Sequence, residues 1–405
     1  MNHRDIFLSV ISWVLAAVFL FVGGAIASRG LNLAPHPDDL AVMDEVLVAR
    51  VLEITQREEW HHEITPDFAL TGTDITFSAR ITSGERRGEV LLAEHHLDDM
   101  MAAREREVSV GDRVLISYNR GLGHYTFIDF VRINFVIILG AVLFALMVLL
   151  GRLKGLNSIV ALGFTCLAVF MVLVPAILAG RSIHLTAIFV SVYIIVSSLV
   201  IVIGPTRKAL SAILGCLGGV FVAALLMLFM DIILNLTGAV DQDSQFLLSL
   251  PLDQPLSLSA IVFAGVIIGA VGAIMDVATS IASSLWEVKL AGGESGSFSQ
   301  IFKSGLNIGK DILGTMLNTL ILAYIGSSLP LILLITFYSY DTSFVELFNR
   351  EMISVEILRA LVGSFGIFSA VPLTSAICGW LYSGEKLKAG GPPSRNRQET
   401  YESNW

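Results

Sequence analysis

Long apolar runs separated by short polar segments occupy most of the chain. A membrane-spanning helix needs about 20 predominantly apolar residues, and eight runs reach that length. They cover residues 6–28, 131–151, 157–180, 183–204, 209–237, 257–284, 312–337 and 354–382. The pattern predicts a polytopic α-helical membrane protein with about eight transmembrane helices.

The first run allows two interpretations. Ala25-Ile26-Ala27 resembles the small-residue cleavage site of a signal peptide. The apolar run before it is about twenty residues long, however, which exceeds the usual apolar region of such a peptide. We therefore expect residues 1–29 to form an uncleaved N-terminal signal anchor helix.

Residues 30–128 follow a different pattern, in which apolar and polar positions alternate over short stretches. Such alternation is typical of half-buried strands. It occurs in EVLVARVLEI, DITFSARI, GEVLLAE and DRVLISYN. About five short strands suit a small closed β-barrel of the OB or SH3-like kind. We expect this barrel to be extracytoplasmic, with a seven-helix membrane domain at 129–384 and a disordered cytoplasmic tail at 385–405.

Composition and charge agree with this division. The chain of 405 residues is 54% hydrophobic, with a mean hydropathy of +0.74, which is too apolar for a soluble globular protein. Residues 30–128 hold eighteen acidic residues, nine arginines and no lysine, so they carry the whole net charge of −9. An acidic barrel argues against nucleic acid and against anionic lipid as its partner.

Basic residues in the short loops predict the orientation of the chain. Clusters at 152–154, 207–208, 289–310 and 386–397 all fall on the same side of the membrane if the chain crosses it eight times. The positive-inside rule assigns that side to the cytoplasm. Both termini are therefore expected in the cytoplasm.

The sixth apolar run contains one carboxylate, Asp276, and no basic residue within GVIIGAVGAIMDVATSIAS, residues 265–283. At helical spacing its small and polar residues follow one stripe. The stripe consists of Gly265, Gly269, Gly272, Asp276, Thr279, Ser280 and Ser283. We expect the glycines to pack closely against another helix and Asp276 with the hydroxyls to form a polar transport site. In the alternative interpretation, Asp276 only accepts hydrogen bonds from a neighbouring helix and locks the pair.

The seventh run adds a second polar face. Asp311, Thr315 and Asn318 lie on one side of the expected helix. We expect this side to face the Asp276 stripe, since sequential helices often pack together. Asp311 has an alternative role as a favourable charge at the N-terminus of the helix. Residues 326–330 are expected to interrupt the outer half of this span.

Three local features of the other spans also yield expectations. Gly215, Gly218 and Gly219 form a close-packing face in the fifth span. Glu356 and Arg359, three residues apart, are expected to form an ion pair. Pro372 within the last span frees a backbone carbonyl that ions or water can use, although most such prolines only kink a helix.

Two histidine pairs flanked by carboxylates lie in the barrel region, His61-His62 and His95-His96. One interpretation is a divalent-metal site built from both pairs. The other is a set of solvated loop residues in an acidic domain. Because adjacent residues on a strand point to opposite faces, such pairs chelate poorly outside loops. The sequence favours the second interpretation, so no metal site is expected.

Several motifs resemble one family of bacterial membrane proteins. They are GAVGAIMDVATSIASSL, KDILGTMLNTLILAYIGSSLP and AVPLT, with SVGDRVLISY and RLKGLNSIVAL in the earlier part of the chain. These stretches are similar to the YibE/F family from about residue 45 to residue 381. Thr279 departs from the family pattern, in which a methionine is expected. The resemblance implies a multi-pass protein of the bacterial cytoplasmic membrane and no established substrate or activity.

The function favoured by these features is a transporter or permease for an unidentified solute or ion, with its polar site in the last three spans. The alternative is a non-transporting membrane platform whose barrel recognises a partner or envelope component. An enzyme is not expected, because no nucleotide-binding, zinc-protease or nucleophile motif is present. We expect no cofactor. The expected partners are the lipid bilayer and the solute or ion, with a second copy of the chain or an envelope protein as further candidates and no nucleic acid.

Overall fold

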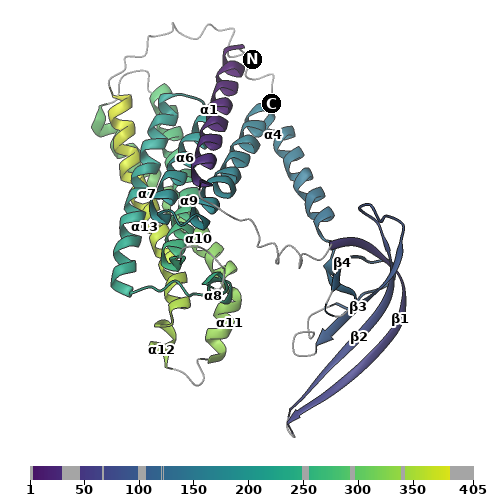
Figure 1. The fold of residues 1–405 in the computed structure, drawn as a ribbon. Coiled ribbons are helices and arrows are strands. Elements are labelled where there is room, and N and C mark those ends of the chain that lie inside the picture. The colour runs from purple at the N-terminus through teal and green to yellow at the C-terminus, as the bar shows by residue number, and fades with distance from the viewer. Residues whose placement is uncertain are drawn as a thin grey trace. The chain divides into compact units, whose positions relative to one another are not determined.

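The computed structural model describes residues 3–29, 46–65, 68–98, 106–119, 121, 123–248, 255–291, 297–338 and 343–383. The chain forms two compact units, 32–146 and 1–31 with 147–405 (Figure 1). The expected tail at 385–405 lies outside the described residues.

The first unit contains a closed five-stranded barrel, as the alternating pattern predicts. Its strands are β1 (Val46–Thr65), β2 (Phe68–Ile81), β3 (Val90–Asp98), β4 (Arg113–Asn119) and β5 (His124–Phe130). They follow the order β1-β2-β3-β5-β4, and β4 pairs back with β1. Only β3 and β5 run parallel, and this pair closes the barrel. The order is that of an OB-fold rather than of an SH3-like barrel.

Strand alternation explains why these segments close around one core. Ile75, Phe77 and Ala79 point inward from β2 and are almost fully buried. Their neighbours from β1 and β4 are equally buried, and include Val51 and Ile116. The outward positions of β2 are the polar Asp74, Thr76, Ser78 and Arg80, so a shift of one residue in its register would expose the core. The hydrophobic pattern therefore sets the register of the barrel.

Within the described ranges, seven helices are long and apolar enough to cross a membrane, which indicates a membrane protein. The helical elements are α1 (His3–Ala27), α4 (Ile133–Ala168), η1 (Val169–Leu173), α5 (Val174–Leu178), α6 (Ile183–Ile203), α7 (Arg207–Leu234), α8 (Gln242–Leu248), α9 (Leu258–Ala291), α10 (Phe298–Ser327), α11 (Leu329–Tyr338), α12 (Phe344–Phe348) and α13 (Glu351–Tyr382). The elements from α4 to α5 form one apolar stretch of 46 residues.

This stretch bends sharply at Arg152, whose φ of 50° and ψ of −124° are not helical. After the bend the chain folds back, so that a side chain on Gly155 would overlap the carbonyl oxygen of Met147. Glycine is required at this close approach because it has no Cβ. The bend lies where the sequence predicts the loop between the second and third spans.

Glycines hold α13 against its neighbours in the helical unit. A Cβ on Gly219 of α7 would lie 2.9 Å from the carbonyl oxygen of Gly366 and 2.8 Å from Ile274 Cγ2. Gly215 approaches Thr374 of α13 in the same way, and Gly218 approaches Leu373. These contacts confirm the close-packing face expected on the fifth span. On the other side of α13, Gly309 of α10 packs against Val371.

The seventh span begins earlier than expected, at Phe298 rather than at residue 312. Ser297 accepts a hydrogen bond from the backbone of Gln300, and the Gln300 side chain accepts one from the Ser297 backbone, which forms a capping box. Ile301 and Gly305 of this polar first half are buried, and α13 packs against α10. This contact stabilises the helical conformation of the segment. The helix is interrupted at Ser328, as the sequence predicts.

A substitution in the α7–α13 contact tests this packing. We predict that Gly219→Ala lowers the stability of the purified protein, because the Gly366 backbone oxygen cannot move aside. Overpacking should lower the free energy of unfolding by about 1–3 kcal/mol, and the higher helix propensity of alanine should offset about 1 kcal/mol of this loss. Gly163→Ala on α4 is the matched control, since its new methyl group would meet nothing within 4 Å. The thermal unfolding midpoints of the two variants are measured in detergent. Equal midpoints would contradict the close contact between Gly219 and Gly366.

Candidate functional site

The stripe around Asp276 lies on the exposed side of α9. Gly265, Gly269, Gly272 and Asp276 are exposed, while Thr279, Ser280 and Ser283 are half-buried. The opposite face of α9 is fully buried and includes Ile267, Ile274 and Ile281. The helix is unbroken from Leu258 to Ala291, which gives a length of about 51 Å. It is therefore long enough to extend well beyond a hydrocarbon core of about 30 Å.

Within the described part of the chain, the glycines of this stripe do not pack against another helix. A Cβ on Gly265 or Gly272 would meet nothing within 4 Å, and one on Gly269 would meet only the Tyr324 hydroxyl at 3.8 Å. The expected close helix contact therefore does not form here. The glycines that serve this purpose lie on α7 and α10, because those helices face the buried α13.

Asp276 itself has no hydrogen bond or ion pair with any described residue. The hydrogen bond that would lock it to a Ser or Thr of a neighbouring helix is not formed in the described part of the chain. The buried Cys216 of α7 lies within electrostatic range of the carboxylate. One turn further along α9, the Thr279 hydroxyl is buried and also has no hydrogen-bond partner among the described residues.

The second polar face lies on α10 and is also exposed. Asp311, Thr315 and Asn318 all point away from the buried side of this helix. Asp311 is thirteen residues beyond the first residue of α10, so it is not an N-terminal charge. That alternative fails because the helix starts at Phe298. The Thr315 hydroxyl donates a hydrogen bond to the carbonyl oxygen of Ile312, 2.9 Å away within its own helix.

The two polar faces lie at the same level of antiparallel helices. Gly269 of α9 is next to Tyr324 of α10, and Leu285 of α9 is next to Gly305 of α10. Asp276 follows Gly269 by seven residues, and Asn318 precedes Tyr324 by six. At 1.5 Å per residue, both lie roughly 10 Å from the Gly269–Tyr324 contact, in the same direction.

Two glycines at this level are not covered by any described residue. A Cβ on Gly272 or on Gly314 would meet nothing within 4 Å. Among the described residues, no hydrogen bond joins Asp276 to the side chains of α10. We call this region the α9–α10 polar face and define it by Gly272, Asp276, Gly314, Thr315 and Asn318.

The last helix contributes buried rather than exposed polar groups. Thr374 and Ser375 follow Pro372 in α13, and both are fully buried. The Ser375 hydroxyl donates to the carbonyl oxygen of Val371 at 2.7 Å. These residues pack against the glycines of α7 and α10 and do not reach the α9–α10 polar face through any described contact.

The expected ion pair at the start of the last span is present. Arg359 Nη1 donates to Glu356 Oε1 at 2.9 Å, and the Ser328 hydroxyl donates to Glu356 Oε2 at 3.0 Å. Glu356 thus joins α13 to the break between α10 and α11. The role of Ser328 was not predicted, although a serine at a helix break is a signal for such a contact.

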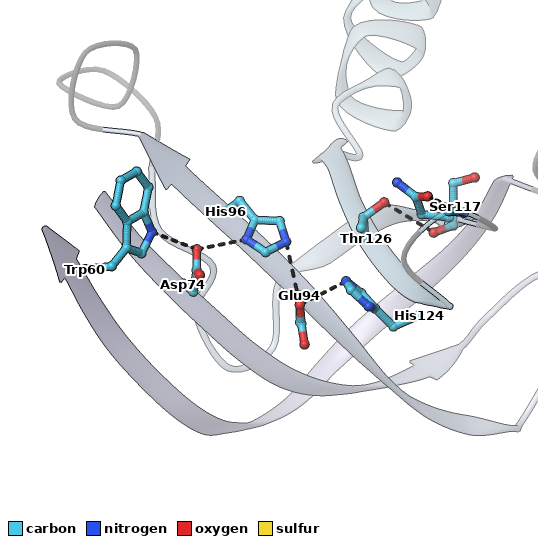
Figure 2. Close-up of polar contacts among 9 residues, drawn as sticks. Trp60, Asp74, Glu94, His96, Ser117, His124 and Thr126 are labelled. Carbon is cyan, nitrogen blue, oxygen red and sulfur yellow. Dashed lines mark hydrogen bonds and ion pairs between the residues drawn. The ribbon is translucent and has the colours of Figure 1, made fainter. Parts of the chain in front are cut away.

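A second polar cluster lies on the outside of the barrel (Figure 2). His124 Nε2 of β5 is 2.9 Å from Glu94 Oε2 of β3, and His96 Nε2 is 3.6 Å from the same oxygen. His96 Nδ1 is 2.8 Å from Asp74 Oδ1, and Trp60 Nε1 donates to that oxygen at 3.2 Å. The network therefore links four strands of the barrel.

The histidine pairs do not act as units in this barrel. His95 is buried in the core, where its ring lies 4.0 Å from that of Phe127. His96 points outward, as strand alternation requires. His61 is exposed on β1, and the side chain of His62 lies outside the described residues. Sequence reasoning missed Glu94 and His124, although Glu94 and His96 show the two-residue spacing of a shared strand face.

Glu356 provides a test of the contact at the N-terminal end of α13. We predict that Glu356→Gln destabilises the protein by about 1–3 kcal/mol, since hydrogen bonds to a charged group are lost or weakened. The control is Glu346→Gln, because Glu346 is exposed and lies 3.9 Å from Arg350. That change should cost about 0–1 kcal/mol. Chemical or thermal unfolding in detergent compares the two, and equal losses would contradict the role of Glu356.

Comparison with known families gives a match to the helical region. A family model described as YibE/F-like protein matches residues 139–384, which include the α9–α10 polar face but not the barrel. No curated protein and no solved structure gives a significant match. The match covers more than half of the chain and agrees with the motifs of the helical region.

Proposed function

Because this chain belongs to the YibE/F-like family, we propose that it is a non-enzymatic multi-pass protein of the bacterial cytoplasmic membrane that moves a solute or ion along the α9–α10 polar face. In this proposal the stretch from α4 to α5 crosses the membrane twice, because it bends at Arg152. The chain then crosses eight times, both termini are cytoplasmic and the barrel is extracytoplasmic. The basic loops support this orientation.

The observation that carries the proposal is the exposed position of Asp276 on a membrane-spanning helix. A charged aspartate at the centre of such a helix costs about 2.5–3.5 kcal/mol even on the most favourable scale. The carboxylate has no hydrogen bond or ion pair among the described residues that would offset this cost. A water-filled path or a bound cation would offset it, and polar residues that line such a path are typical of transporters.

The residues near Asp276 suit a path for a cation or a proton. A Cβ on Gly272 or on Gly314 would meet nothing within 4 Å, so no described side chain fills either position. Thr315 and Asn318 supply neutral oxygens at the same level, and Asp311 lies about two turns further inward on α10. On α9, Thr279, Ser280 and Ser283 continue the polar stripe in the same direction. We propose that Asp276 binds the transported cation or proton and that the hydroxyl and amide groups hydrate it.

Flux measurements test the role of Asp276. In lipid vesicles that contain the purified protein, proton flux is followed with an entrapped pH-sensitive dye under a potassium diffusion potential. We expect Asp276→Asn to reduce the flux at least about tenfold, which corresponds to about 1.4 kcal/mol. Asp243→Asn is the control, since Asp243 is exposed at the start of the short α8. Equal flux in wild type and Asp276→Asn would remove Asp276 from the path.

A platform is the second candidate, and the shape of the β1–β2 hairpin favours it. β1 pairs with β4 only from Val46 to Arg50, while its pairing with β2 continues to Thr65. Beyond the Trp60–Gly72 pair, β2 pairs only with β1. A two-stranded arm that extends past the other strands offers a surface for a partner in the cell envelope.

Exchange of the barrel separates the two candidates. We predict that replacement of residues 46–130 by an unrelated small domain leaves the flux within about twofold of wild type, a change of about 0.4 kcal/mol. The reason is that the α9–α10 polar face belongs to the helical unit. Absence of flux of protons, Na⁺ and K⁺ in wild-type vesicles would instead favour the platform.

A further inference from the structure

We propose that Glu94, His96 and His124 bind a divalent transition-metal ion of the Zn²⁺ class on the outside of the barrel. One donor atom from each residue lies within 4.8 Å of the other two. Figure 2 shows the three side chains converging from β3 and β5. This inference is independent of transport by the helical unit.

The donor set suits zinc chemistry. Zn²⁺ takes imidazole nitrogen at about 2.0–2.1 Å and carboxylate oxygen at about 2.0–2.2 Å, usually in tetrahedral geometry. Two donors at those distances lie about 3.3 Å apart in a tetrahedron. The observed separations of 2.9 and 3.6 Å from Glu94 Oε2 to the two imidazoles lie on either side of that value. Small rotations of the side chains therefore suffice to receive an ion.

Asp74 orients His96 for this role. An ionised carboxylate only accepts hydrogen bonds, so the contact at 2.8 Å requires His96 Nδ1 to carry a proton. In the neutral ring Nε2 then has a free lone pair, which points towards Glu94 Oε2. Two acceptors that face each other repel unless a proton or a metal cation lies between them, and a metal ion can take this place. A carboxylate that holds the outer nitrogen of a ligating histidine is a recurrent feature of zinc sites.

Trp60 in turn fixes Asp74. Its indole nitrogen donates to the same oxygen of Asp74, at 3.2 Å. The indole ring lies over Gly72, where a Cβ would overlap the ring and lie 2.5 Å from the carbonyl oxygen of Leu97. Glycine at this strand position therefore admits the ring. The orientation of His96 thus depends on side chains from three strands, which is more than a solvated surface histidine requires.

The ion would join the strands at the closing seam of the barrel. β3 and β5 pair over a short parallel stretch, in which Ala93 faces Tyr125 and Glu94 faces Thr126. Glu94 and His96 lie on one side of this seam and His124 on the other. Few backbone hydrogen bonds join β3 to β5. A metal ion bound by residues of both strands would add a further connection between them, so metal binding should stabilise the closed barrel.

Solvent can reach the site, and three protein ligands leave a fourth position open. The exposed fractions of the side chains are 34% for Glu94, 47% for His96 and 31% for His124. A zinc site with three protein ligands normally holds water in the fourth position. The ion would therefore exchange with the medium, and chelators should remove it.

Binding is tested on the full-length protein, purified in detergent without a polyhistidine tag and stripped with a chelator. Zn²⁺ is titrated against a chromophoric competitor, and bound zinc is counted by elemental analysis. We expect one zinc ion per chain in wild type. Glu94→Gln and His124→Ala should each weaken binding by at least tenfold. Asp74→Asn, which changes a positioning residue, should weaken it by about 10–100-fold.

His61→Ala is the matched control, because His61 is an exposed histidine on β1 outside the cluster. Its affinity should equal that of wild type. Circular dichroism checks that each variant keeps its strands, and Glu94→Gln is nearly isosteric. Equal zinc affinity in wild type and His124→Ala would overturn the proposal, as would no zinc retained by wild type above background.

Two measurements on wild type do not depend on any variant. Saturation with Zn²⁺ at 100 times the dissociation constant should stabilise the barrel, by an amount that grows with the logarithm of the free ion concentration. Co²⁺ in place of Zn²⁺ should give the intense visible absorption of a four-coordinate site. The weak spectrum of hydrated Co²⁺, or an unchanged thermal midpoint with saturating zinc, would contradict a site at the seam.

Discussion

Close approach of helices at glycine is the constraint on which the membrane part of this protein depends. Lipid tails are as apolar as the side chains of a helix, so burial of apolar surface does not drive helices together within a bilayer. Contact area must come from close packing, and close packing needs small residues. Here α13 supplies bulk in Val371, Leu373 and Thr374, while α7 and α10 supply glycines opposite them. Once α13 is fixed between these two helices, the buried face of α9 is fixed as well, because Ile274 packs between Gly219 and Gly366.

The position of α9 explains why its own glycines remain open. Its branched side chains are used for the contact with α7 and α13, so the stripe with Asp276 must turn the other way. The α10 helix cannot close over this stripe, since Gly309 already holds it against Val371. It touches α9 at the Gly269–Tyr324 and Leu285–Gly305 contacts and leaves the level of Asp276 uncovered. The exposure of the Asp276 stripe is thus a consequence of where the other glycines lie, rather than a property of the stripe alone.

This dependence separates what the sequence predicts from what it does not. Apolar runs, strand alternation and the three-residue spacing of opposite charges are local signals, and they predict the helices, the barrel and the ion pair between Glu356 and Arg359. The partners of a glycine are a global property, so the sequence cannot distinguish Gly219, which packs, from Gly272, which is open. The start of α10 was missed because residues 298–311 are too polar for a transmembrane run, although Ser297 and Gln300 form a recognisable capping box. The barrel cluster was missed because Glu94 and His124 meet only through the pairing of β3 with β5.

The two candidate sites differ in how much free energy their carboxylates cost. A single carboxylate on a membrane helix is informative because desolvation makes it costly, whatever its neighbours are. An exposed carboxylate beside a histidine on the surface of the barrel costs little, so proximity alone indicates nothing. What distinguishes Glu94 and His96 is the chain of contacts behind them, from Gly72 through Trp60 to Asp74, which fixes the ring that faces the carboxylate. His95 shows the contrast within one dipeptide, since the same side chain one position earlier points into the core and packs on Phe127. The alternation that makes adjacent histidines poor chelators therefore also frees His96 to meet His124 across the seam.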